Sequence, residues 1–119
     1  MQDLITLRAK IETSLETLQW ARNELKIRSK DKAKAMGEYE KKIAITMLRL
    51  RQGQTIDLDG EEISYSATTG LDKIAKGVCY KESIALDLAE STYKNAVLGI
   101  QTVMAEINAY QSILRYLEE

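Results

Sequence analysis

Four carboxylates between residues 57 and 62 are the densest set of metal-ligand side chains in the chain. They belong to Asp57, Asp59, Glu61 and Glu62. Clustered carboxylates bind calcium, but an EF-hand loop centred on Gly60 would need acids at residues 55 and 66. The chain has Thr55 and Ser66 there. A solvated turn is therefore the better interpretation, an acidic contact surface is the alternative, and no metal site is expected.

Catalytic chemistry is difficult to assemble from the remaining residues. The chain has no histidine, which removes the commonest general base and metal ligand. Cys79 is the only cysteine, so it has no histidine to activate it and no internal disulfide partner. Gly70 and Gly77 lack the spacing of a phosphate-binding loop, and Val78 stands where such a loop has lysine. We expect no enzyme and no cofactor, with Cys79 used for packing.

A run of basic residues is the one concentrated charge feature. It comprises Lys26, Arg28, Lys30, Lys32 and Lys34. On a helix, residues spaced four apart share a face, so a basic stripe is predicted at Arg22, Lys26, Lys30 and Lys34. A solvated helix face, a protein-contact surface and a phosphate-contacting surface are three interpretations. Base recognition would want interleaved aromatic or amide side chains, which the run lacks.

The C-terminal segment carries the clearest structural pattern, which predicts a helix over about 80–118. Apolar residues follow a 3-4-3-4 spacing without interruption, typical of a coiled-coil seam. The seam is Leu86, Ala89, Tyr93, Ala96, Ile100, Val103, Ile107, Tyr110, Leu114 and Leu117. Val97, Met104 and Ile113 widen the apolar stripe beyond what one partner helix covers. The width favours three or four helices around a shared core.

The N-terminal half predicts a second long helix, over residues 1–52. One seam is Leu4, Leu7, Ile11, Ser14, Leu18, Ala21 and Leu25, and a second is Met36, Tyr39, Ile43 and Leu50. The step from Leu25 to Met36 is a stutter that a continuous helix can absorb; a break near 29–31 is the competing interpretation. A continuous helix of this length measures about 75 Å, which implies a hairpin, a dimer, or both.

Between the long helices the apolar period changes from helical to alternating. Ile56, Leu58, Ile63 and Tyr65 alternate with polar residues around Asp59-Gly60, which predicts a β-hairpin within 53–69. A four-residue loop would pair Leu58 with Ile63 and Ile56 with Tyr65. Thr69 to Asp72 matches a capping box for a short helix over 70–77, ended by Gly77. The off-seam Trp20 is either an exposed anchor or packed inside a wide bundle.

Composition agrees with a single all-α domain over 1–119: a long antiparallel helical hairpin or bundle with a short β-hairpin insertion. The chain has 119 residues and no proline, which favours uninterrupted helices. Residues 1–52 carry a net charge of +5 and residues 53–119 carry −6; this favours either two halves that attract each other or a basic arm for an anionic partner. No signal peptide or membrane span is expected.

Several segments resemble short helical proteins encoded by bacteriophages and prophages. They are Gly37-Glu38-Tyr39 with Ile43–Leu50, Leu71-Asp72-Lys73-Ile74-Ala75-Lys76-Gly77, Leu86–Lys94 and Ile107–Leu117. Such proteins look like early-region products encoded near replication and recombination genes. The resemblance implies a bacterial cytoplasm and carries over no active site. By architecture alone, phage inhibitors of host nucleases and of CRISPR systems are the analogy.

The leading functional hypothesis is therefore a phage-encoded helical protein that binds and inhibits or modulates a host protein, namely a defence or DNA-processing nuclease. Its expected contact surfaces are the basic stripe at 22–34 and the acidic hairpin at 55–66. A nucleic-acid-binding accessory factor in phage replication or recombination is the first alternative. A structural, self-assembling protein is the second alternative, and the expected assembly is a homo-oligomer, a dimer.

Overall fold

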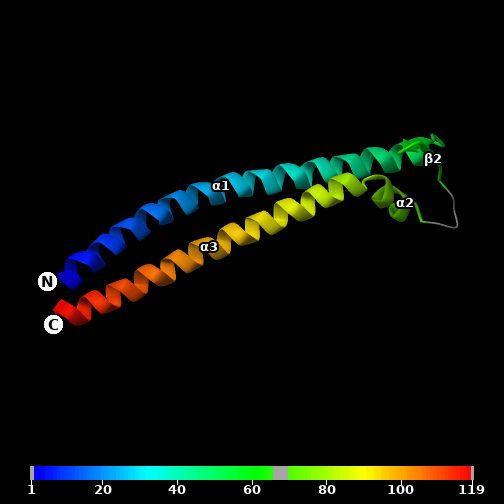
Figure 1. Ribbon diagram of the computed structural model, residues 1–119. Helices are drawn as coiled ribbons and strands as arrows, with labels where there is room; N and C mark the ends of the chain where they lie inside the picture. The colour runs from blue at the N-terminus through cyan, green and yellow to red at the C-terminus, as the bar shows by residue number, and fades with distance from the viewer. Residues whose placement is uncertain (1, 66–69, 119) are drawn as a thin grey trace. The chain divides into compact units, whose positions relative to one another are not determined.

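The computed structural model describes residues 2–65 and 70–118. In chain order its elements are α1 (Gln2–Arg51), β1 (Ile56–Leu58), β2 (Glu61–Ile63), α2 (Leu71–Val78) and α3 (Tyr80–Glu118) (Figure 1). The predicted fold class is confirmed, because helices dominate and a two-stranded antiparallel sheet separates the two long ones. The backbone contacts group into two compact units. Unit 1 takes in the described residues of Met1–Lys30 and Ser91–Glu119, and unit 2 those of Asp31–Glu90.

Unit 1 is an antiparallel pair of helical segments, the start of α1 and the end of α3, drawn in blue and in orange to red in Figure 1. Arg8 on α1 donates a 3.0 Å hydrogen bond to the Glu118 carboxylate near the end of α3. The buried residues of this unit are Leu7, Ser14, Leu18, Ala21 and Ile107. All five belong to the predicted seams, so the 3-4 spacing identified the facing surfaces of the two helices.

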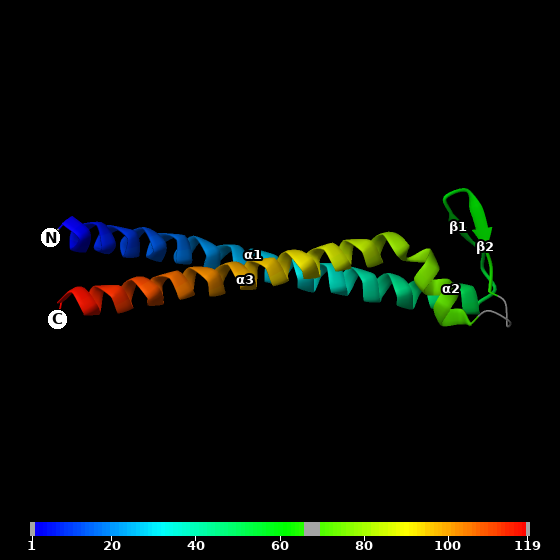
Figure 2. The same cartoon turned by 60° about the horizontal axis from the view of Figure 1, so that its bottom comes forward.

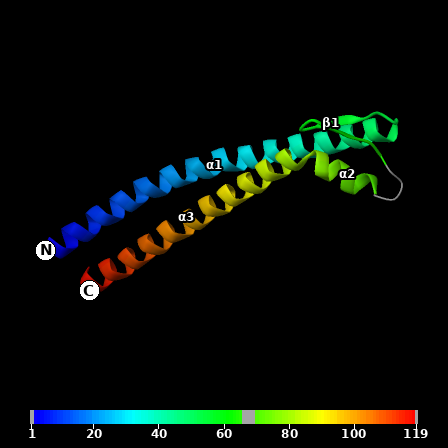
Figure 3. The same cartoon turned by 45° about the vertical axis from the view of Figure 1, so that its right-hand side comes forward.

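Unit 2 combines the second half of α1 with the hairpin, α2 and the first turns of α3. Figure 2 shows α2 beside the last turns of α1, and Figure 3 shows the start of α3 reaching α1. Its core is Thr46, Leu50, Ala75, Val78 and Cys79. Side chains from α1 and α2 therefore meet there with Cys79, the residue between α2 and α3, which makes α2 an integral part of the packing.

Helix α1 is helical at every residue from Gln2 to Arg51 and passes residues 29–31 without a break. Its half-buried side chains continue the 3-4 spacing after Leu25, at Arg28, Lys32 and Ala35. The prediction of Met36 as a seam residue is therefore wrong, since its side chain is 38% exposed. Long basic side chains can occupy inward positions because their methylene stems cover apolar surface while the charged group reaches water.

The hairpin is tighter than predicted. Its strands pair Ile56 with Ile63 and Leu58 with Glu61, so the predicted register is wrong by two residues and Tyr65 lies beyond the strands. Only Asp59 and Gly60 form the turn, with φ of 51° and 90°. Two consecutive positive φ values are the requirement of a type I′ turn, whose twist matches that of paired strands.

Two expectations at helix ends are also corrected. Helix α2 continues through Gly77 to Val78, and Cys79 caps it by donating its backbone N–H to Ala75 O; a buried Cys79 and Val78 hold the helix past the glycine. Leu117 is 46% exposed rather than buried, since the seam reaches the end of α3 there. Thr69, the first residue of the predicted capping box, lies outside the described residues. The residue before α2, Gly70, makes no side-chain cap.

Candidate functional site

Two adjoining hollows in unit 1 lie beside the predicted basic stripe. One, of about 380 Å³, is lined by Leu25, Lys26, Ser29, Lys30 and Tyr93. The other, of about 430 Å³, is lined by Tyr93, Lys94, Val97, Leu98 and Gln101. They share Tyr93, so together they form one surface, which we call the basic groove. The pairing of α1 with α3 brings the two hollows together, because the first combines α1 residues with Tyr93 of α3 and the second is lined by α3 alone.

The charge of the basic groove has one sign. Lys26, Lys30 and Lys94 are exposed, and no carboxylate is among its lining residues. Within residues 2–65 and 70–118 these three ammonium groups have no ion-pair partner, and Arg22 lies one turn before Lys26. The apolar contribution comes from Val97 and from Leu98, which is 59% exposed. Such a surface can bind an anionic group and bury apolar area at the same time.

The structure divides the predicted stripe into exposed and inward residues. Arg22, Lys26 and Lys30 are exposed in unit 1, and Lys34 is exposed in unit 2. Arg28 is half-buried and lies 3.5 Å from the Glu24 carboxylate, and Lys32 is also half-buried. Arg28 and Lys32 therefore lie at inward positions of α1. The use of the six cations as a contact surface stays a prediction.

Sequence reasoning missed Lys94, Tyr93 and Leu98 as members of the groove. Tyr93 was placed on the seam, and Lys94 was one of only five cations after residue 52. Their position near Lys26 could have been predicted only from the antiparallel register of the two helices. That register depends on where the chain reverses, and neither seam specifies this by itself.

The acidic residues of the hairpin are exposed, but one of them, Asp59, contacts other side chains of the protein. Asp59 accepts a 2.7 Å hydrogen bond from the Tyr80 hydroxyl, and its carboxylate lies 3.5 Å from the Lys81 ammonium. The Tyr80 hydrogen bond, followed by the Lys81 charge, lowers the pKa of Asp59. Asp57 and Glu62 lie opposite each other across the strands. The hairpin therefore offers Asp57, Glu61 and Glu62 as a contact surface, while Asp59 anchors the turn.

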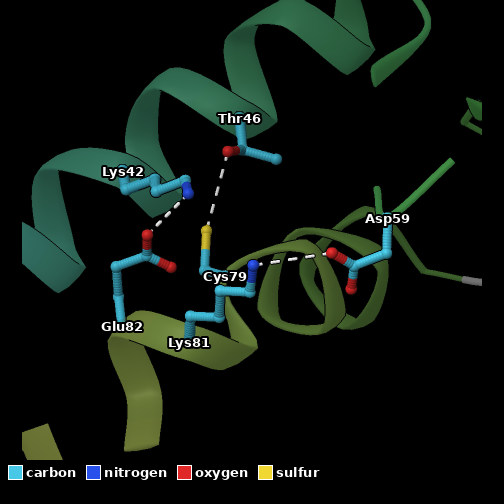
Figure 4. A network of polar contacts seen from close by, with 6 residues as sticks. All are labelled: Lys42, Thr46, Asp59, Cys79, Lys81 and Glu82. Carbon is cyan, nitrogen blue, oxygen red and sulfur yellow. Dashed lines mark hydrogen bonds and ion pairs between the residues drawn. The ribbon is translucent and has the colours of Figure 1, made fainter. Parts of the chain in front are cut away.

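A polar network links α1 to the start of α3 in unit 2 (Figure 4). The Lys42 ammonium donates a 2.6 Å hydrogen bond to Glu82 Oε1, and this bond lowers the pKa of Glu82 and raises that of Lys42. The Cys79 sulfur lies 3.6 Å from the Thr46 hydroxyl and is fully buried. Cys79 therefore packs in the core.

Among the described residues, no group of three or more acidic or cysteine side chains could hold a metal ion. No helix in the same part of the chain combines the length and the apolarity that a bilayer crossing requires. Comparison with known proteins finds no matching family model, no matching curated protein and no matching solved structure.

Proposed function

We propose that the protein is a helical binding module whose basic groove binds an acidic surface of another protein. The observation that carries the proposal is the groove itself, where exposed Lys26, Lys30 and Lys94 stand beside exposed Leu98. Cations next to apolar area are typical of protein-contact surfaces, because charge orients the partner and apolar burial holds it.

The resemblance to phage proteins supports a bacterial host protein as the partner. A defence or DNA-processing nuclease is the proposed target, and inhibition or modulation is the proposed effect. The bacterial cytoplasm is the proposed place of action. The lack of histidine and the buried position of the only cysteine support binding rather than catalysis. The exposed Asp57, Glu61 and Glu62 of the hairpin provide a second contact surface, suited to a basic patch on the same partner.

The test reverses two of the groove's exposed charges together with Arg22, which lies one turn before them. Arg22, Lys26 and Lys30 are replaced together by glutamate, and the matched control replaces Lys10, Lys41 and Lys73, which are exposed elsewhere. Tagged proteins are used to capture partners from nuclease-treated bacterial lysate, and the purified partner is then titrated by calorimetry. The groove variant should bind at least about tenfold more weakly, whereas the control should bind like the wild type. Equal affinities of the wild type and the groove variant would remove the groove from the proposal.

Nucleic-acid binding is the second candidate, favoured by the same exposed ammonium groups and by Tyr93 in both hollows. It predicts that only nucleic acid co-purifies, or that captured proteins disappear when the lysate is digested. It also predicts affinity that falls steeply with salt concentration, because counterions are released from the phosphates.

A further inference from the structure

The basic groove separates charge from apolar surface along its length. Tyr93 of α3 lines the same hollow as Lys26 and Lys30 of α1, so these residues lie level with one another. Because the two helices are antiparallel in unit 1, α3 residues after Tyr93 lie progressively closer to the start of α1 (Figure 1). Lys94 directly follows Tyr93 and therefore belongs to the lysine end of the groove. Leu98 lies about one turn beyond Lys94, toward the other end.

The apolar end continues past the hollow onto Met104 and Leu15. Met104 follows Gln101, the last lining residue, by three positions, so it lies on the same side of α3. Leu15 precedes Lys26 by 11 positions, about three helical turns, so it lies on the same side of α1. Met104 likewise follows Tyr93 by 11 positions, which places it level with Leu15. Both side chains are exposed.

The other flank of unit 1 has no such separation of charge from apolar surface. Its hollow, of about 260 Å³, includes Trp20, Glu24 and Arg28 and shares no lining residue with the basic groove. Glu24 and Arg28 lie 3.5 Å apart and neutralise each other, while Trp20 is 65% exposed. Uncompensated lysines beside exposed apolar residues are therefore a property of the groove flank, and the Trp20 flank provides a control.

The furrow between two paired helices has the shape that receives a third helix. Rows of side chains on one helix pack into the furrow, and helices that dock in grooves use apolar anchors spaced along one face. From Leu15 to Lys30 the α1 wall rises by 15 residues, about 22 Å at about 1.5 Å per residue. A docked helix of about four turns therefore reaches from the apolar end of the groove to its lysine end.

We infer that the occupant of the basic groove is an amphipathic helix of the partner protein, with acidic residues concentrated in one half and apolar residues in the other. The acidic half meets Lys26, Lys30 and Lys94, and charge complementarity fixes its sign. The apolar half packs on Leu98 and Met104, which are otherwise exposed to water. The inference rests on the proposed function and goes further, because it specifies the structure of the partner's contacting segment and the order of its charged and apolar residues.

The probe is a synthetic, fluorescently labelled peptide of about four helical turns, with glutamates in one half and leucines at helical spacing in the other. Fluorescence anisotropy measures its binding to the full chain. The wild type should bind this peptide, and the variant with Lys26, Lys30 and Lys94 all replaced by glutamate should bind it at least about tenfold more weakly. A peptide with lysines in place of the glutamates should show the reverse preference. No binding of the glutamate peptide to the wild type would overturn the inference.

A peptide with a central proline tests whether the occupant is helical. Proline interrupts a helix, so it should weaken binding to the wild type at least about tenfold. Equal binding of the proline peptide and the glutamate peptide would mean that the groove takes an extended segment, which also overturns the inference.

A pair of protein variants tests the apolar end. Leu98→Glu with Met104→Glu should bind the glutamate peptide at least about tenfold more weakly, because both apolar contacts are lost and like charges are added. Trp20→Glu with Ile27→Glu, on the other flank, is the matched control and should bind like the wild type. All four side chains are exposed, so both variants should keep the helical circular dichroism of the wild type. Equal affinities of the Leu98 and Met104 variant and the wild type would contradict the inference.

The partner captured for the proposed function separates the two proposals. A partner that loses affinity when the groove lysines are reversed, but keeps it in the Leu98 and Met104 variant, would leave the proposed function standing and overturn the helix as its occupant. Binding to vesicles of phosphatidylglycerol, without binding to the glutamate peptide, would assign the groove to an anionic membrane surface instead and overturn both.

Discussion

At the scale of single residues, the hairpin turn is held by contacts that its own carboxylates did not reveal. Asp59 looked like one of four equivalent acids, but Tyr80 and Lys81 bind it from the first turn of α3. The hydrogen bond from Tyr80 lowers the pKa of Asp59, and the same bond raises the pKa of Tyr80. Both shifts favour the state with an ionised Asp59 and a neutral Tyr80.

The Asp59–Tyr80 contact should therefore be stable only within a pH window. A lowered Asp59 pKa gives stability that is present above the unfolded value, about 3.9, and is lost as the pH falls through the lower folded value. A raised Tyr80 pKa gives stability that is present below about 10 and is lost as the pH rises through the higher folded value. We expect the difference in urea midpoint between wild type and Tyr80→Phe to be constant at intermediate pH and to shrink at both extremes.

Two observations would complete this measurement. Tyr65→Phe serves as the control, because Tyr65 is an exposed tyrosine outside the strands. The difference in urea midpoint between wild type and Tyr65→Phe should not change at acidic pH. A wild-type midpoint advantage that stays the same at strongly acidic pH would show that Asp59 is not the acceptor that matters in solution.

At the scale of elements, one glycine weakens the helix that contains it and another is required by the turn that contains it. Gly37 lies in the interior of α1 with open space around it, whereas Gly60 has φ of +90° in the hairpin turn. The first glycine costs helix stability because it has more freedom to lose on folding. The second is needed because other residues avoid a positive φ.

Gly37→Ala and Gly60→Ala should therefore have opposite effects on the free energy of unfolding. We expect Gly37→Ala to raise it by about 0.8–1 kcal/mol and Gly60→Ala to lower it by about 1–2 kcal/mol. Chemical denaturation followed by circular dichroism measures both. A lower free energy of unfolding for Gly37→Ala would mean that another molecule contacts residue 37 in solution, since no atom of the described residues lies within 4 Å of a Cβ atom placed there.

At the scale of the whole chain, the charges balance although they are unevenly distributed along the sequence. Residues 1–52 carry +5, residues 53–119 carry −6, and the net charge is −1. Within each unit, ion pairs between α1 and α3 neutralise part of this uneven charge. Examples are Arg8 with Glu118 and Lys42 with Glu82. The cations of the basic groove are among those that remain for an external partner.

This distribution predicts weak binding to nucleic acid. Three lysines provide few phosphate contacts, and an overall negative chain adds no long-range attraction. We expect no measurable binding of a fluorescent DNA duplex at physiological salt, with fluorescence anisotropy as the measurement. Binding whose logarithm falls with log salt by about 0.9 for each phosphate contact would instead make nucleic acid the partner of the groove. The variant with Arg22, Lys26 and Lys30 reversed should then lose that binding.

The amino-acid pattern alone determined the two long helices, their facing residues and the hairpin between them. Apolar spacing reports which side of a helix avoids water, and Asp59-Gly60 reports a tight turn, because both are local consequences of backbone geometry. Only the tertiary structure decided that Arg28 and Lys32 lie inward and that Lys94 lies in the same groove as Lys26 and Lys30. It also decided that Asp59 accepts a hydrogen bond from Tyr80. Each of these depends on the register between segments distant in the chain, and a repeating seam permits several registers that only the complete packing distinguishes.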